Sequence, residues 1–164
     1  MSKLLILDVD GVMTNGTKLY GTTGQVVGKM FADQDFTAIK MFQRAGWHVV
    51  WLSADQHINE KVAHDRKIEF YNSRRSDGTI NKVIMYDTLR LQFGPEDVIY
   101  VGDDLLDLPV MQEIINDGGQ AYCPSNSAPQ VMKVATPLGR PGGAGCILEL
   151  YAMLYPDDIE PPTH

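Results

Sequence analysis

The residues of this chain best suited to chemistry are five aspartates that follow two apolar segments. The apolar segments are residues 4–7 and 98–101, each long enough for one strand. The aspartates are Asp8, Asp10, Asp103, Asp104 and Asp107. Clustered carboxylates repel one another, so such a group needs a bound cation or added protons. Hard oxygen ligands of this kind suit Mg²⁺, which prefers carboxylates together with phosphate and keeps several waters. The pattern therefore predicts a site that binds Mg²⁺ together with a phosphate group.

A simpler interpretation is that these aspartates form turns and helix N-caps. For one aspartate after one strand, that interpretation is the favoured one. Here the patterns D-x-D-G and G-D-D-x-x-D both follow apolar strands of the same chain. Because two such patterns coincide, we favour a chemical role over a purely local one.

The elements that must position these residues alternate along the chain. The expected strands cover residues 4–7, 47–52, 68–71, 98–101, 120–122 and 134–136. Apolar residues at helical spacing and turn signals at the ends predict helices over residues 37–45, 58–66, 80–93, 106–115 and 144–154. Between them, β-rich stretches around Gly21-Thr22-Thr23-Gly24 predict a hairpin over residues 16–31.

This alternation predicts an α/β, Rossmann-like fold, with an open parallel sheet and helices on both faces. Residues 1–155 are expected to form a single domain, and the Pro-rich, acidic residues 156–164 a flexible tail. Open parallel sheets bind ligands beyond the carboxyl ends of their strands. Asp8, Ser53 and Asp103 each follow a predicted strand, so the three are expected at one edge of the sheet.

The order of these markers resembles the haloacid dehalogenase superfamily. D-x-D-G-V-x-T lies near the N-terminus, and G-D-D-x-x-D follows later; between them Ser53 ends a strand and Lys82 enters a helix. The resemblance implies that Asp8 is a nucleophile forming an aspartyl-phosphate and that Asp10 is the general acid and base. It also implies that Ser53 and Lys82 bind the transferring phosphoryl oxygens.

The same resemblance implies a metal site. Mg²⁺ would be held by Asp8, the backbone carbonyl of Asp10 and Asp103, with Asp104 and Asp107 supporting that shell. Neither the gap after Asp10 nor the gap between Ser53 and Lys82 is long enough for a separate cap domain. The chain therefore resembles the capless branch that acts on octulosonate 8-phosphates and sialic-acid-type 9-phosphates. Proteins of that branch are tetramers in which hairpins form a barrel and tails help to close a neighbouring active site, so a homotetramer is expected.

Further features of the chain match that branch, and others depart from it. Asp35 stands at the acidic position after the hairpin, and Gly142-Gly143-Ala144-Gly145 with Glu149 resembles the family's C-terminal motif. The departures are Thr14-Asn15-Gly16, Ser53-Ala54-Asp55, and Leu148 where an Arg is common. Since Leu cannot bind a carboxylate, the substrate could differ from the octulosonate phosphate. The candidate substrate-binding residues are Thr14, Asp35, Asp55, Arg74, Arg75 and Arg140, although surface positions are the simpler interpretation for the arginines.

Composition narrows the function further. The formal net charge of −7 argues against non-specific binding to nucleic acid. The sequence contains no stretch of 18 apolar residues, so no membrane-spanning helix is expected. A cytoplasmic phosphatase of a small phosphorylated sugar or sugar acid is thus the leading hypothesis. The alternatives are a phosphatase of nucleotides or nucleic-acid ends and a catalytically weak tetrameric interaction or regulatory module. A phosphoryl transferase fits less well, because without a cap water reaches the aspartyl-phosphate.

Overall fold

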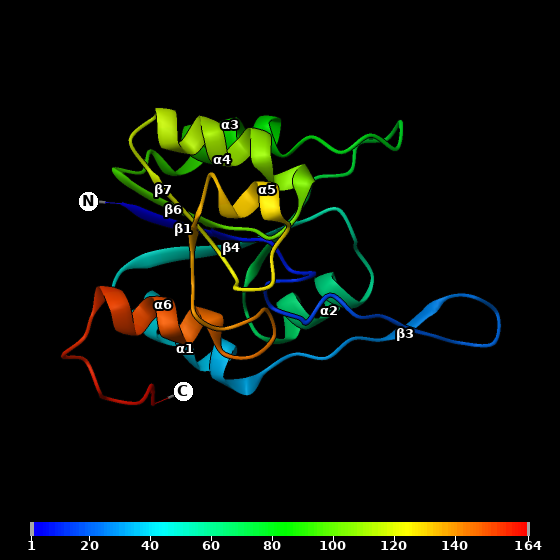
Figure 1. The fold of residues 1–164 in the computed structure, drawn as a ribbon, viewed down its shortest axis with the longest axis horizontal. Helices are drawn as coiled ribbons and strands as arrows, with labels where there is room; N and C mark the ends of the chain where they lie inside the picture. Colours follow the sequence, from blue (N-terminus) through cyan, green and yellow to red (C-terminus); the bar gives the residue numbers. More distant parts are fainter. Residues whose placement is uncertain (1, 164) are drawn as a thin grey trace.

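The computed structural model describes residues 2–163. Six parallel strands form one sheet in the order β5-β4-β1-β6-β7-β8 (Figure 1). The strands are β1 (Lys3–Leu7), β4 (Trp47–Ser53), β5 (Glu69–Asn72), β6 (Asp97–Val101), β7 (Gln120–Cys123) and β8 (Thr136–Pro137). The open, parallel α/β fold predicted from the alternation is confirmed, and no inserted cap lies among the described elements.

Helices cover both faces of the sheet, as Figure 1 shows. On one face lie α1 (Asp33–Arg44), α2 (Ile58–Asp65) and α6 (Cys146–Leu154); on the other lie α3 (Lys82–Phe93), α4 (Leu108–Asn116) and α5 (Pro129–Met132). Alternate side chains of β1 enter the two layers: Leu5 and Leu7 pack with the first set, Leu4 and Ile6 with the second. Burial on both faces explains why this strand is continuously apolar in sequence.

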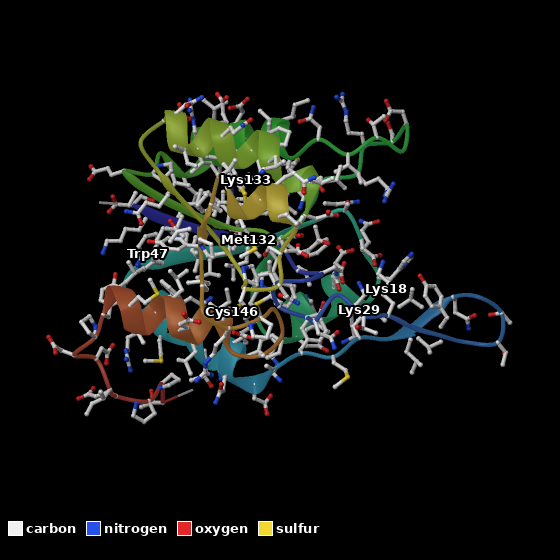
Figure 2. The ribbon with its side chains drawn as sticks, in the orientation of Figure 1. Lys18, Lys29, Trp47, Met132, Lys133 and Cys146 are labelled. Atoms are coloured by element: carbon white, nitrogen blue, oxygen red, sulfur yellow. The ribbon has the colours of Figure 1, made fainter. Side chains whose placement is uncertain are left out.

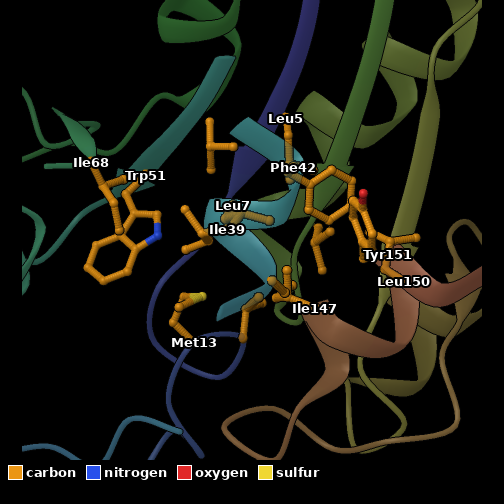
Figure 3. Packing of buried hydrophobic residues seen from close by; sticks show 14 of the residues in the cluster. Leu5, Leu7, Met13, Ile39, Phe42, Trp51, Ile68, Ile147, Leu150 and Tyr151 are labelled. Atoms are coloured by element: carbon orange, nitrogen blue, oxygen red, sulfur yellow. The ribbon is translucent and has the colours of Figure 1, made fainter. Parts of the chain in front are cut away.

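The first layer is the larger core and holds the helices that flank the site. Leu5 and Leu7 of β1 lie among Ile39 and Phe42 of α1 and Ile147 of α6 (Figure 3). Phe42 packs edge-on against Tyr151, with ring centroids 5.0 Å apart. This packing sets the position of β1, and therefore of the residues at its carboxyl end.

Several predicted boundaries shift for local reasons. The helix expected from residue 80 begins at Lys82, because the Asn81 side chain accepts a hydrogen bond from the Ile84 amide at 3.0 Å and caps it. The helix expected over residues 106–115 is split into a 3₁₀ turn, η1 (Leu105–Asp107), and α4, which has a proline in its first turn. Helix α5 was not predicted, since four residues carry too little periodicity to be detected.

The predicted hairpin is present and projects from the body of the molecule (Figure 1). It consists of the antiparallel strands β2 (Leu19–Tyr20) and β3 (Val26–Gly28), with Leu19 opposite Gly28. Residues 156–163 contain no regular element, and Arg44 of α1 contacts Asp158 there at 2.7 Å. Within residues 2–163 no helix is both long and apolar enough to cross a bilayer.

Candidate active site

The carboxyl ends of β1, β4 and β6 open into one cavity of about 480 Å³. Because these three strands are neighbours in the sheet, the residues that follow them meet there, as the sequence predicted. Nine of the predicted site residues line the cavity: Asp8, Asp10, Ser53, Asp55, Arg74, Lys82, Asp103, Asp104 and Asp107. Ala54, which lies between Ser53 and Asp55, also lines it.

Asp8 lies at the end of β1 and is almost fully buried, with 7% of its surface exposed. Its amide donates to the Val101 carbonyl of β6 at 2.9 Å, which continues the sheet one residue beyond the strand. Its Oδ1 accepts a hydrogen bond from the Val9 amide at 2.9 Å and lies 3.2 Å from the Lys82 ammonium. Burial, and next the charge of Asp107, raise the pKa of Asp8 well above its usual range, while Lys82 opposes the rise.

Lys82 is held between two carboxylates. Its Nζ lies 3.2 Å from Asp8 Oδ1 and 2.6 Å from Asp107 Oδ1, and the side chain is 5% exposed. Although burial acts to lower the pKa of Lys82, Asp8 and Asp107 raise it above the ordinary value, so the group is an ammonium. A buried positive charge beside Asp8 is suited to binding a phosphoryl oxygen.

Asp107 positions its neighbours. Its Oδ1 accepts from Lys82 and, at 2.6 Å, from the Tyr100 hydroxyl, while its Oδ2 accepts from the Asp103 and Asp104 amides at 2.9 and 3.0 Å. One carboxylate thus fixes Lys82, Tyr100 and the loop after β6. The role predicted for Asp107, support of the metal shell, is consistent with these contacts.

A cation would fit between Asp8 and Asp103. Oxygens of Asp8, Asp103 and Asp107 lie within 4.8 Å of one another. The two Asp107 oxygens already accept four hydrogen bonds, which leaves Asp8 and Asp103 as the members of this group with capacity to bind a cation. Asp103 Oδ1 is buried without a hydrogen-bond partner among the described residues, as expected of an atom that binds an ion. Burial, followed by Asp107, raises the pKa of Asp103 to about 6.

Two glycines allow the loop after β1 to reach this site. Gly11 has φ +88°, and a Cβ there would lie 1.8 Å from Asp103 Oδ2. A Cβ on Gly142 would lie 1.8 Å from the Gly11 carbonyl oxygen. The Gly-rich segment near the C-terminus therefore packs directly on the loop that carries Asp8 and Asp10, which gives a physical reason for its glycines.

Asp10 is oriented by two donors that the sequence analysis missed. Lys29 Nζ lies 2.8 Å from its Oδ1, and Asn59 Nδ2 donates to its Oδ2 at 3.1 Å. Asn59 also donates to Ser53 Oγ at 3.1 Å, and that oxygen accepts from the Asp55 amide at 3.1 Å. Because both contacts use Ser53 as an acceptor, its own hydroxyl proton stays available for a phosphoryl oxygen.

Lys29 joins the hairpin to the site. Its side chain is 1% exposed and lies 2.8 Å from both Asp10 and Asp55, and 3.0 Å from Asn59. Figure 2 shows Lys18 and Lys29 where the hairpin meets the body. Lys18 lies 3.3 Å from Asp55. Burial acts to raise the pKa of Asp55, but Lys29 and Lys18 lower it below its usual range. A lysine in a hairpin and an asparagine in a helix carry no sequence signal for these roles.

Asp104 and Arg74 lie on loops at the solvent-exposed edge of the cavity. Asp104 is exposed, and its side chain accepts from the Leu105 amide at 2.7 Å, which caps the 3₁₀ turn. Arg74 is exposed, and it donates from Nε to the Ala54 carbonyl and from Nη1 to the Gly78 carbonyl.

The other predicted substrate-binding residues do not line this cavity. The Thr14 hydroxyl is buried and accepts from the Gly11 and Gly16 amides, and Asp35 is buried and accepts from the Gly145 and Ile147 amides. Arg140 contacts Gln34 at the surface, and Arg75 lies in an exposed turn. Leu148 packs against the larger core, as suits an apolar side chain. Within one chain the structure therefore does not bring these residues to the phosphate-binding position.

Comparisons with known proteins show which proteins this chain resembles in sequence and in fold. No family model matches the chain. The chain is 31% identical over 155 residues to the 3-deoxy-D-manno-octulosonate 8-phosphate phosphatase KdsC of Escherichia coli (strain K12), covering 93% of this chain and 78% of that protein. The cobalt-bound deoxy-D-mannose-octulosonate 8-phosphate phosphatase of Haemophilus influenzae matches with a TM-score of 0.82 at 29% identity, over 94% of this chain and 88% of that chain. The 3-deoxy-D-manno-octulosonate 8-phosphate phosphatase of Yersinia pestis matches with a TM-score of 0.80 at 29% identity, over 94% of this chain and 80% of that chain.

Proposed function

Because this chain belongs to the KdsC family of phosphatases in the haloacid dehalogenase superfamily, and is thus a phosphoric monoester hydrolase, we propose that Asp8 performs the hydrolysis as a nucleophile. The observation that carries the proposal is the position of Asp8 at the carboxyl end of β1, 3.2 Å from Lys82 and close to Asp103 Oδ1, which has no hydrogen-bond partner within residues 2–163. A carboxylate there can attack phosphorus while Lys82 neutralises the phosphoryl oxygens.

The reaction proceeds in two displacements. An oxygen of Asp8 bonds to phosphorus as the bond between phosphorus and the leaving alcohol breaks, and Asp10 gives that alcohol a proton. Asp10 then takes a proton from water, which attacks the aspartyl-phosphate and releases inorganic phosphate and Asp8. Lys29 and Asn59 hold the two Asp10 oxygens in place during both transfers. Ser53 donates its hydroxyl to a phosphoryl oxygen.

Asp8, Asp103 and the Asp10 backbone carbonyl would hold Mg²⁺. When bound, the ion supplies positive charge that offsets the clustered carboxylates and the phosphate. Support comes from the donor set, which is all oxygen, from the orphaned Asp103 Oδ1, and from the cobalt named for the Haemophilus influenzae protein.

The substrate we propose is a small phosphorylated sugar or sugar acid, of the 3-deoxy-octulosonate 8-phosphate or nononate 9-phosphate type. The names of the relatives and a cavity of about 480 Å³ support this class. The changed segment Ser53-Ala54-Asp55 lies at the cavity wall, so the preferred member of the class can differ from that of the relatives.

We also propose that the active protein is a homotetramer assembled through the hairpin. Leu19, Tyr20, Val27 and Met30 are between 51% and 72% exposed, which leaves an apolar surface on a projecting element. Burying such a surface between copies is favourable.

Release of inorganic phosphate tests the proposed activity. Wild-type protein with Mg²⁺ should release phosphate from a panel of sugar and sugar-acid phosphates, and EDTA should stop it. Asp8→Asn should lower kcat by about 10³-fold or more, because the amide is a poor nucleophile. The control is Asp87→Asn, at an exposed position on α3, which should behave as wild type. A silent wild type across the panel would refute the activity, and equal rates for Asp8→Asn and wild type would refute the mechanism.

A further inference from the structure

Among residues 2–163, three positively charged side chains line the cavity, and one of the three has no carboxylate partner there. Lys82 lies between Asp8 and Asp107, and Lys18 lies 3.3 Å from Asp55. Arg74 forms no ion pair with any carboxylate among residues 2–163, yet it lines the same cavity. Because six aspartates also line this cavity, an uncompensated guanidinium is the group most able to attract a second anion of the substrate.

The Arg74 guanidinium is oriented before any ligand arrives. Its Nε donates to the Ala54 carbonyl at 3.1 Å, and its Nη1 donates to the Gly78 carbonyl at 3.0 Å. These two bonds use two of the five N–H donors of an arginine and leave three free. Neutral carbonyl partners fix the side chain without cancelling its charge, so less rotamer entropy is lost on binding.

The loop that carries Arg74 is itself well defined. Arg74 and Ile80 form an antiparallel bridge, and the Arg75 amide donates to the Thr79 carbonyl at 2.7 Å. The Asp77 side chain accepts from the Thr79 amide at 2.9 Å and closes the turn. The other anchor, Ala54, follows Ser53, which we assign to the phosphoryl group. The guanidinium therefore links the turn that contains Gly78 to the loop after β4, next to the proposed phosphate position.

We propose that Arg74 is a specificity-determining residue that binds the carboxylate of a sugar-acid phosphate while the phosphate lies at Asp8. This inference rests on the proposed function, since it assigns the second anionic group of that substrate class. A planar guanidinium fork binds a carboxylate through two parallel hydrogen bonds, which a lysine cannot reproduce. A second phosphate group could use the same donors, and the experiment separates the two.

Binding is measured in the Asp8→Asn background with Mg²⁺, so that turnover is too slow to disturb the titration. The ligands are 3-deoxy-D-manno-octulosonate 8-phosphate, D-arabinose 5-phosphate, which has a phosphate but no carboxylate, and fructose 1,6-bisphosphate, each titrated calorimetrically. With Arg74 intact, the sugar acid should bind more tightly than arabinose 5-phosphate. Arg74→Gln should raise the Kd of the sugar acid about 10- to 100-fold and that of arabinose 5-phosphate by less than about threefold. Arg74→Lys should have an intermediate effect. Arg66→Gln, at an exposed arginine directly after α2 and outside the cavity, should change neither Kd.

Equal affinity for the two sugars with Arg74 intact, or no binding of the sugar acid, would overturn the proposal. So would an equal loss for both sugars in Arg74→Gln. If Arg74→Gln weakened the binding of fructose 1,6-bisphosphate alone, the assignment of Arg74 to a carboxylate would be overturned. Melting curves of the variants show that each is folded. If wild type hydrolyses no ester while Arg74-dependent binding of the acid persists, the proposed activity fails and the recognition role is supported.

Discussion

The Asp107 carboxylate shows how one residue organises the site. It accepts hydrogen bonds from Lys82, from Tyr100 and from two amides of the loop after β6, and none of its surface is exposed. Burial, with Asp107 next, raises the pKa of Tyr100 above its usual range, so the hydroxyl stays a donor. Removing this carboxylate would leave a buried ammonium with one counter-charge fewer.

We therefore expect Asp107→Ala to destabilise the fold by about 3 kcal/mol, the cost of breaking a buried ion pair from one side. Urea unfolding of wild type and variant measures the difference. Asp87→Ala, at an exposed helix position, is the matched control and should change stability by less than about 0.5 kcal/mol. A loss for Asp107→Ala no larger than the control would show that its contacts contribute little.

The pKa of about 6 at Asp103 predicts how Mg²⁺ and protons compete. A carboxyl whose pKa is raised on folding stabilises the metal-free protein, and this stabilisation is fully present at pH values below the ordinary carboxyl pKa of about 4. That contribution is lost as the pH rises through about 6. Mg²⁺ requires the ionised form, so it should raise Tm more at about pH 7.5 than at about pH 5. Melting curves with Mg²⁺ or EDTA measure this. Asp103→Asn should remove most of the difference, and equal shifts at both pH values would contradict the assignment.

At the scale of elements, the site depends on a close contact between segments far apart in sequence. The Gly-rich segment before α6 packs on the loop after β1: the Gly143 amide donates to the Val12 carbonyl at 2.9 Å, and Gly142 faces the Gly11 carbonyl. Helix α6 in turn packs on α1 in the larger core. The position of the nucleophile loop therefore depends on the C-terminal helix.

Gly142→Ala should disturb this contact, because its Cβ would lie 1.8 Å from a backbone oxygen that cannot easily move. We expect a loss of stability of about 1–3 kcal/mol and a lower kcat, since the loop carries Asp8 and Asp10. Denaturant unfolding and phosphate release measure the two effects. Gly28→Ala is the control, because a Cβ there meets only Leu19 at 3.7 Å. If Gly142→Ala and Gly28→Ala had similar stability and kcat, the backbone around Gly142 would be able to move enough to accept a side chain.

At the scale of the whole molecule, the hairpin is the feature that a single chain leaves unexplained. It extends away from the sheet (Figure 1) and carries exposed apolar residues, while Lys29 at its base contacts the site. An assembly through the hairpin would cover those residues. It would also bring neighbouring chains close to the cavity.

The variant Leu19→Asp/Met30→Asp should lower the mass in solution from that of a tetramer, because two charges would face an apolar interface. Light scattering coupled to gel filtration measures the mass, and circular dichroism checks the fold. Leu91→Asp, at an 89% exposed position on α3, is the control and should keep the wild-type mass. A wild-type protein that is monomeric at all concentrations would refute the assembly.

The sheet, the site at the carboxyl ends of its strands and the two aspartate motifs within that site could be predicted from the sequence alone. These follow from local patterns, since apolar runs define buried strands and the residue after each strand must lie at the sheet edge. Asp8, Ser53 and Asp103 could be found in this way, whereas the role of Lys82 at the start of a helix was implied only by the family resemblance.

The residues from distant segments that support them could be recognised only in the folded chain. Lys29 and Asn59 reach Asp10 from a hairpin and a helix, and Arg74 reaches the cavity from a short turn. Their roles depend on distances set by packing between elements, which no periodicity in the chain encodes. The same holds for Thr14 and Asp35, whose side chains satisfy buried amides and so serve the backbone.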